Sequence, residues 1–152
     1  MAEYRARGKY FEDFVIGEEV CSPSRTVTEA DIVNFAGLSG DYMQIHTSEQ
    51  FAENTVLKGR IAHGFLTMAI STGQSFQTGI LDGTAIALLE SHITFAAPVR
   101  IGDSVHTVTR ISQLLETGKP DRGILVSESE VRNQREEVVL KHVDKVMVLR
   151  RQ

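Results

Sequence analysis

The sequence contains a single cysteine, Cys21, among its 152 residues. One thiol rules out a disulfide within the chain, and it rules out a zinc site built from several cysteines. No candidate base lies near Cys21 in the sequence. We therefore expect this thiol to be buried or half-buried, as unreactive cysteines usually are.

Positive charge is also scarce. The chain carries 16 Lys and Arg residues against 20 Asp and Glu residues, which gives a formal net charge of −4. Proteins that bind nucleic acids through the phosphates need a basic surface. We therefore expect no nucleic-acid partner.

Long apolar segments are absent as well. No stretch approaches the roughly 18 consecutive apolar residues that a membrane-spanning helix needs. The first residues, "MAEYRARGKYFEDF", carry charges where a signal peptide has an apolar segment. We accordingly expect no membrane partner and a cytoplasmic location.

What the chain does contain is typical of a folded domain. Hydrophobic residues make up 41% of it and charged residues 24%, close to ordinary globular usage. The length suits one domain, because two domains would each have a small core. We expect residues 1–152 to form a single domain in which residues 1–13 are an N-terminal arm lying on the body.

The first half of the chain shows helical patterns. The segment "TEAD" begins at Thr28 and has the pattern of a capping box, with Asp31 at its last position. Gly40 is placed to end this helix. Its apolar face is expected to consist of Ile32, Val33, Phe35, Ala36 and Leu38.

Two more helices are expected after it. A short one follows a cap at Thr47 or Ser48, with Phe51 and Ala52 facing inward. The strongest helical segment is "HGFLTMAISTGQSFQTGIL", residues 63–81. Its apolar residues cover more than one stripe, which predicts a buried helix.

Strand patterns fill the chain after Gly83, in residues 84–99, 103–116, 123–134 and 136–150. A shorter strand over residues 20–27 is interrupted by Pro23, so we expect it at an edge. Helices followed by strands predict an α+β domain, with one long central helix packed on a curved antiparallel sheet. The exposed edges of such a sheet favour a homodimer or a higher homo-oligomer.

One short stretch carries candidate chemistry. In "GLSGDYMQIHTSEQFA", residues 37–52, Asp41 and His46 lie five positions apart, just past the first predicted helix. Taken alone, an Asp after a Gly is usually a turn or capping residue, and a His at this place can simply precede a helix cap. The spacing by itself therefore leaves the question open.

Three stretches in order resemble the MaoC-like hydratases of the hotdog fold: "FAGLSGDYMQIHTSEQFA", "GRIAHGFLTMAIS" and "ITFAAPVRIGDSV". The resemblance covers the chain from about residue 14 to residue 148. The third stretch is shared with hotdog thioesterases, whereas the first is the most specific. It matches the motif of the (R)-specific enoyl-CoA hydratases at Ser39, Gly40, Asp41, Ile45, His46 and Ala52.

The chain departs from that motif at one place. Met43-Gln44 stands where the family commonly has Asn-Pro between the Asp and the His. The change removes the rigid proline from the turn and a polar group from beside the pair. The gap of five residues is kept.

The resemblance implies a hotdog fold and a hydro-lyase that reversibly adds water to a 2-enoyl-CoA, giving an (R)-3-hydroxyacyl-CoA without a metal or an organic cofactor. Asp41 and His46 would hold the water between them. A carboxylate and an imidazole suit this task as general acid and base.

The resemblance also implies an oxyanion site at the start of the long helix. Gly64 would donate its N–H to the thioester oxygen, helped by the positive end of the helix dipole. Without a side chain, Gly64 would let the thioester come close. The family's Ser on this helix corresponds in register to Thr72, with Ser71 beside it, and His63 would hydrogen-bond the helix start or shape the pocket.

Two alternatives remain open at this point. One is an acyl-CoA thioesterase, although "GFLTMAISTGQSFQ" lacks the acidic residue that hotdog thioesterases generally place on the central helix. The other is a non-catalytic acyl-CoA binding subunit, which Met43-Gln44 favours. The acyl chain length is not predicted.

The sequence contains further histidines and cations besides the residues of the matched motif. No two histidines lie at i, i+4 on a helix or at i, i+2 on a strand, so we expect no metal site. No function is assigned to His92, His106 and His142. Three cations could meet the phosphates of coenzyme A: Lys58, Arg60 and Arg100.

Overall fold

The structure, a computed structural model, describes residues 6–151. Residues 1–5 of the expected N-terminal arm lie outside the described residues. The helices are η1 (Phe11–Asp13), α1 (Glu29–Ser39), α2 (Gln44–Thr47), α3 (Glu49–Glu53) and α4 (Gly64–Gln77). The strands are β1 (Glu19–Cys21), β2 (Arg25–Thr26), β3 (Ala85–Phe95), β4 (Ser104–Leu115), β5 (Arg122–Asn133) and β6 (Val138–Leu149).

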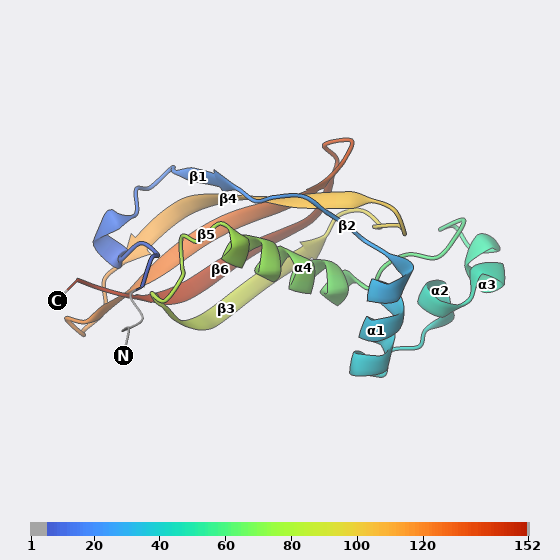
Figure 1. The fold of residues 1–152 in the computed structure, drawn as a ribbon, viewed down its shortest axis with the longest axis horizontal. Coiled ribbons are helices and arrows are strands. Elements are labelled where there is room, and N and C mark those ends of the chain that lie inside the picture. Colours follow the sequence, from blue (N-terminus) through green and yellow to red (C-terminus); the bar gives the residue numbers. More distant parts are fainter. Residues whose placement is uncertain (1–5, 152) are drawn as a thin grey trace, which may run out of the picture.

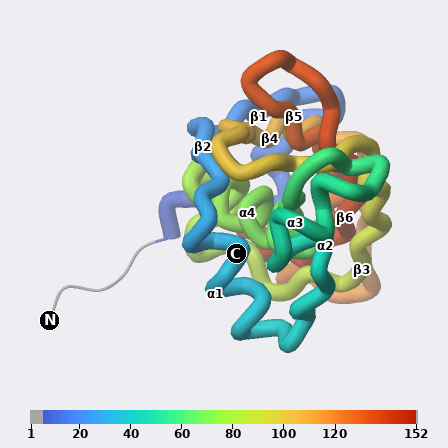
Figure 2. The backbone as a smooth tube through the Cα atoms, turned by 90° about the vertical axis from the view of Figure 1, so that its right-hand side faces the viewer, coloured from blue at the N-terminus to red at the C-terminus, as the bar shows by residue number. Residues whose placement is uncertain are grey.

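The strands form one antiparallel sheet in the order β1-β4-β5-β6-β3, and β2 also pairs with β4. Helix α4 runs along one face of the long strands, while α1, α2 and α3 gather beyond one end of the sheet (Figure 1). Figure 2 looks at the molecule from that end. The predicted α+β class, with a long helix on an antiparallel sheet, is confirmed. Among the described residues, no helix is both long and apolar enough to span a membrane.

Helix α1 has the predicted ends but not the predicted apolar face. The amide of Asp31 donates to the Thr28 hydroxyl, and the Asp31 carboxylate accepts from the amide of Thr28, which confirms the capping box. Gly40 follows the helix with φ 76°. Only Ile32 and Ala36 of this helix are buried, because α1 meets the body along one narrow stripe. The expectation for Val33 and Leu38 is wrong, since both are exposed, Leu38 at 85%.

The short second helix is in fact two. Ser48 caps α3, as one of the two predicted positions, but a separate turn of helix, α2, precedes it and contains His46. Ala52 is buried as expected, whereas Phe51 is 44% exposed, so its predicted inward orientation is wrong. With five residues, α3 turns only one stripe toward the body.

The long helix is shorter and less enclosed than predicted. It ends at Gln77, and Gly79 with φ 76° turns the chain away. One face packs on the sheet through residues such as Leu66 and Ile70, but the opposite face is exposed, including Phe65 and Phe76. The prediction that α4 is buried on most sides is therefore wrong for a single chain.

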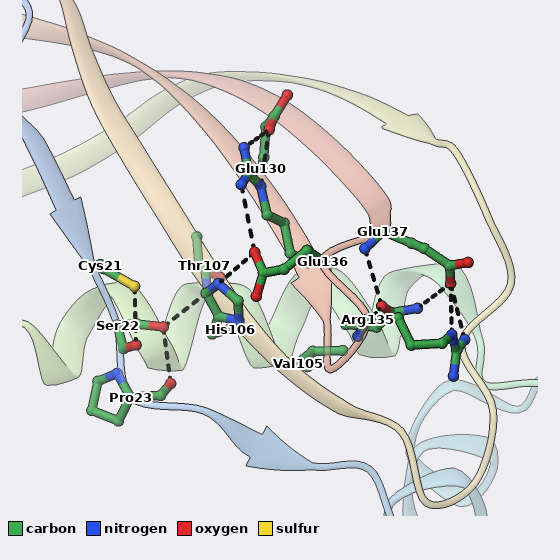
Figure 3. Close-up of polar contacts among 12 residues, drawn as sticks. Cys21, Ser22, Pro23, Val105, His106, Thr107, Glu130, Arg135, Glu136 and Glu137 are labelled. Atoms are coloured by element: carbon green, nitrogen blue, oxygen red, sulfur yellow. Dashed lines mark hydrogen bonds and ion pairs between the residues drawn. The ribbon is translucent and has the colours of Figure 1, made fainter.

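The interrupted strand lies at the sheet edge, as predicted. Pro23 separates β1 from β2, and the Ser22 hydroxyl beside it joins this edge to β4 by accepting from the amide of Thr107 at 2.9 Å (Figure 3). Cys21 is exposed, contrary to our expectation, because β1 is an edge strand that pairs with β4 and with no other strand of residues 6–151.

The core contains two apolar clusters with a polar band between them. One cluster includes Val105, Val131 and Leu140, and the other includes Ile111 and Leu125. The strand pairing places the residues of this band between the two clusters along β4, β5 and β6. It contains Ser71, Gln74, Thr107, Ser127, Ser129, His142 and Asp144.

Candidate active site

The loop after α1 places Asp41. The amide of Asp41 donates to the Ser39 hydroxyl, and Asp41 Oδ1 accepts from the amide of Met43, both at 3.2 Å. The carboxylate thus shapes its own turn. It remains half-buried rather than enclosed, so one oxygen holds the loop while the side chain still faces solvent.

His46 lies on α2 and is 6% exposed. Its Nδ1 is 2.8 Å from the backbone oxygen of Ile61. The same segment binds α2 through its backbone, since the amide of Ile61 donates to the oxygen of Ile45. The orientation of the His46 ring is therefore set by the chain that leads into α4.

His63 is the residue before α4, and it is 3% exposed. Its Nε2 lies 2.9 Å from the backbone oxygen of Asp41. Its ring stacks on the ring of His46, with centroids 3.8 Å apart and planes 26° apart. His63 thus contacts both residues of the predicted pair.

The hydrogen bonds decide which ring nitrogens are protonated. A carbonyl oxygen only accepts, so Nδ1 of His46 and Nε2 of His63 must each donate a proton. A neutral His46 then keeps a lone pair on Nε2, and a neutral His63 keeps one on Nδ1. His63 Nδ1 is buried and has no hydrogen-bond partner within residues 6–151.

The structure brings Asp41, His46 and His63 together. One ligand atom from each, a carboxylate oxygen or a ring nitrogen, lies within 4.8 Å of the others. The family resemblance predicted that Asp41 and His46 lie close together, whereas their spacing alone left this open. The addition of His63, 17 positions further on, comes from the backbone that carries Ile61 and Ala62 against residues 99–100.

A cavity of about 390 Å³ opens beside this group. Its lining includes His46, Gly64 and Thr67, and the remaining lining residues are apolar, among them Leu57, Phe65, Phe95 and Val99. Its size lies in the range of ligand pockets in proteins. An apolar chain carrying a polar group at one end matches such a lining.

Gly64 is the first residue of α4 and lines the cavity. Helix-start amides have no acceptor within the helix. A Cβ added at Gly64 would lie 2.6 Å from Cε1 of Phe95. The Phe95 ring therefore occupies the space that a side chain at position 64 would fill. This steric reason for a glycine differs from the one we expected, which was that a thioester could come close to Gly64.

Neither hydroxyl predicted on α4 lines this cavity. Thr72 is exposed, and its hydroxyl donates to the backbone oxygen of Met68. Ser71 is fully buried, and its hydroxyl contacts Thr107 at 2.9 Å and Nε2 of His142 at 3.0 Å. Within one chain, the structure does not bring either residue to Asp41 and His46.

His142, to which the sequence analysis assigned no function, is buried and contacts Ser71 and Asp144. Its Nδ1 is 3.0 Å from Oδ2 of Asp144. The other oxygen of that carboxylate, Oδ1, accepts a hydrogen bond from the Ser91 hydroxyl. Residues two positions apart on a strand share a face, so His142 and Asp144 lie on the same side of β6. Contact with Ser71, 71 positions away, had no signal in the sequence.

Two of the three cations proposed to meet the phosphates of coenzyme A, Arg60 and Arg100, form hydrogen bonds within the chain. Hydrogen bonds to Glu49 and Glu29 raise the pKa of Arg60 above its usual value, and the bond to Arg60 lowers the pKa of Glu49. Arg100 donates to the backbone oxygen of Leu57. Arg60 and Arg100 therefore hold the loop before α4.

Comparisons with known proteins identify the family of this chain. The family described as "MaoC like domain" matches residues 13–133. An (R)-specific enoyl-CoA hydratase from Rhodospirillum rubrum is 37% identical over 72% of this chain and 74% of its own length. Protein MaoC from Klebsiella aerogenes is 36% identical over 64% of this chain, but the match spans only 29% of that longer protein.

Solved structures show the same fold. The MaoC-like dehydratase from Rhodospirillum rubrum superposes with a TM-score of 0.87 at 31% identity, covering 95% of this chain and 99% of that one. A Mycobacterium tuberculosis protein described as having a double hotdog fold gives a TM-score of 0.85 at 20% identity, covering 97% of this chain and 46% of that one. The predicted hotdog fold is confirmed. The chain belongs to the MaoC-like domain family, a family of hydratases and dehydratases.

Proposed function

We propose that this protein is a hydro-lyase that reversibly adds water to a 2-enoyl-CoA thioester, giving an (R)-3-hydroxyacyl-CoA. The observation that carries the proposal is the position of His46, with Asp41 beside it, at one wall of an apolar cavity whose lining also includes Gly64. The names of the relatives support the same reaction class.

Asp41 and Nε2 of His46 would hold the attacking water. As the water oxygen bonds to the β-carbon, one of its protons passes to this pair, and a proton is delivered to the α-carbon. The carbon–carbon double bond becomes single, and the sum of the steps is the addition of H and OH. The reverse sequence eliminates water.

Negative charge develops on the thioester oxygen as the enolate forms. The amide of Gly64 would donate to that oxygen, and the start of α4 adds the positive end of a helix dipole. Backbone donors of this kind supply the stabilisation without a cation. The apolar walls around Phe95 and Val99 would hold the acyl chain.

The partner of the chain would be a second copy of itself. Within the part of the chain that the structure describes, strand β3 ends the sheet and pairs only with β6. Its residues Leu88 and Leu89 are exposed, and the free face of α4 exposes Phe65 and Phe76. An edge strand this long and apolar is typical of an interface, so we propose a homodimer.

The test is the absorbance of the conjugated thioester after mixing purified protein with crotonyl-CoA and longer 2-enoyl-CoAs. We expect the absorbance to fall, and Asp41→Asn to lower the rate by about 10²–10⁴-fold. Release of free thiol would indicate a thioesterase instead. Thermal stabilisation by the substrates without turnover would indicate a binding subunit, and either result would overturn the proposal.

A further inference from the structure

Ser71, His142 and Asp144 have the contacts of a serine-hydrolase triad, although none of them lines the cavity of the proposed reaction. In such a triad the serine donates its proton to the histidine and then reacts as a nucleophile. We propose that the hydrogen bond runs in the opposite direction here. His142 is a buried imidazolium that donates to both Ser71 and Asp144, and it ties α4 to β6 instead of activating the serine.

Gln74 fixes the direction of the first hydrogen bond in this group. Its Nε2 lies 2.6 Å from the backbone oxygen of Val105 and 3.2 Å from that of Pro23. Because carbonyl oxygens only accept, the atom between them must be the amide nitrogen. The other atom of the amide, Oε1, is then an acceptor. The Thr107 hydroxyl, 2.9 Å from it, must therefore donate to Gln74.

Each hydroxyl has one proton, and this limit carries the direction on to His142. Thr107 donates its only proton to Gln74, so the Ser71 hydroxyl, 2.9 Å away, must donate to Thr107. Ser71 then has no proton left for the ring. Its contact with Nε2 of His142, at 3.0 Å, is a hydrogen bond only if Nε2 carries a proton.

The other ring nitrogen of His142 faces a carboxylate. Nδ1 lies 3.0 Å from Oδ2 of Asp144. Burial alone would raise the pKa of Asp144, but the hydrogen bonds from His142 and Ser91 lower it below the usual value, so this carboxyl is ionised near neutral pH. An ionised carboxylate only accepts, so Nδ1 must donate as well. A proton on both nitrogens makes the ring an imidazolium.

No other charged group faces this pair within residues 6–151. Helix α4, which packs over it, has no ionisable side chain between Gly64 and Gln77. A cavity of about 50 Å³ beside the pair has no ionisable lining residue except His142 and Asp144. The residues opposite the pair on the neighbouring strands are also uncharged: Ser91, Ile93, Ser127 and Ser129. Because a buried charge without a partner is costly, the imidazolium is the cation that Asp144 requires.

This arrangement gives Ser71 a structural role. Its side chain is fully buried, its proton is held by Thr107, and an imidazolium cannot accept that proton as a general base would. The bond from His142 to Ser71 joins β6 to α4, which lies along this face of the sheet (Figure 1). A hydrogen bond from a charged donor is about twice as strong as a neutral one. The inference does not depend on the proposed reaction.

The deciding experiment is NMR of the full chain labelled with ¹⁵N-histidine, at about pH 7.5. A solvated histidine, with a pKa of about 6.5, carries both ring protons in only about a tenth of the molecules at this pH. We expect one histidine with two ring N–H signals and nearly equal ¹⁵N shifts, and we expect these signals to disappear in His142→Gln. The urea-unfolded sample is the reference for neutral rings. An unprotonated Nε2 on His142 in the folded protein would overturn the proposal.

Asp144→Asn tests the direction of the hydrogen bonds. The new amide can donate to Nδ1, so a neutral ring suffices, but Gln74, Thr107 and Ser71 still require a proton on Nε2. We expect the ring to lose the Nδ1 proton and to keep the Nε2 proton. The opposite tautomer would contradict the direction that we propose. If this variant fails to fold, the wild-type spectrum still decides the charge of the ring.

Glu90→Gln is the matched control, because it also changes a carboxylate to an amide on a strand of this sheet. Glu90 is exposed and bonds Lys145 instead of His142. The ring of His142 should keep both protons in this variant. Loss of a ring proton here too would show that Asp144 is not the group that holds it, and would overturn the pairing.

The tie between α4 and the sheet has its own test. Ser71→Ala removes the acceptor, so the amides of α4 should exchange with deuterium at least about tenfold faster, since a hydrogen bond from a charged group is lost. Ser75→Ala, one turn further along the same helix, is the control. Equal exchange in the two variants would overturn the tie. A fluorophosphonate reagent should leave Ser71 of the wild type unlabelled, whereas labelling of Ser71 would show an activated nucleophile and overturn the proposal.

Discussion

The ring of His63 stacks on the ring of His46 at 3.8 Å, and the two residues come from different elements, His46 from α2 and His63 from the position before α4. His63 also bonds the backbone of Asp41. One side chain therefore fixes the relative position of the two proposed catalytic groups.

Replacing His63 should lower kcat through misplacement of that pair. We expect His63→Ala to reduce kcat by on the order of 10²-fold, because displacement of reacting groups by about 1 Å costs this much. His63→Gln keeps a donor for the Asp41 carbonyl and should reduce kcat less. Steady-state rates with crotonyl-CoA in the presence of EDTA check this, and equal losses in the two variants would contradict it.

Gly64 and Phe95 should show coupled effects on stability. A methyl group at position 64 would lie 2.6 Å from the Phe95 ring, so Gly64→Ala should destabilise the protein by roughly 1–3 kcal/mol. Phe95→Leu removes part of the ring, and the double variant should be more stable than the sum of the single changes predicts. Urea unfolding of the four proteins measures the coupling, and strictly additive losses would show that the ring moves aside freely.

The sequence alone predicts the parts of this structure that depend on local patterns. The Thr28–Asp31 box, the end of α1 at Gly40 and the start of α4 near His63 are such parts. The structure places Asp41 beside His46, and His46 and Gly64 both line one cavity. The family resemblance predicted that these residues belong to one site, which the periodicity of the sequence does not predict.

The remaining features depend on tertiary contacts. The exposure of Phe51 and Leu38 follows from how far α1 and α3 extend beyond the sheet (Figure 1). The Ser71–His142 contact follows from the packing of α4 on β6. No pattern within a single segment encodes either one.

Asp144 should make the stability of the protein depend on pH. Burial on its own would raise the pKa of this carboxyl, but hydrogen bonds from His142 and Ser91 outweigh it and lower the pKa below the usual value. A carboxyl with a lowered folded pKa contributes stability that is fully present above its unfolded pKa, about 4. That contribution is lost as the pH falls through the lower folded value.

Asp144→Asn tests this dependence. The variant should be less stable than the wild type by roughly 1–3 kcal/mol near pH 7, since the carboxylate bonds a buried ring. The difference should stay constant down to about pH 5 and shrink below about pH 4. Thermal unfolding across this pH range measures it, and a difference that persists undiminished at pH 2 would show that the ionised carboxylate is not the cause.

The proposed dimer should depend on the exposed edge of β3. Leu88→Lys places a charge on a side chain that a single chain leaves exposed, so the fold of one chain should tolerate it. A second copy against this strand would have to bury that charge without a partner, at a cost of several kcal/mol. We therefore expect the wild type to sediment at twice the chain mass and Leu88→Lys to sediment as a monomer. Val56→Lys is the control, because Val56 is 95% exposed and lies outside β3 and α4. A wild-type monomer, or a dimer that survives Leu88→Lys, would show that this edge is not the interface.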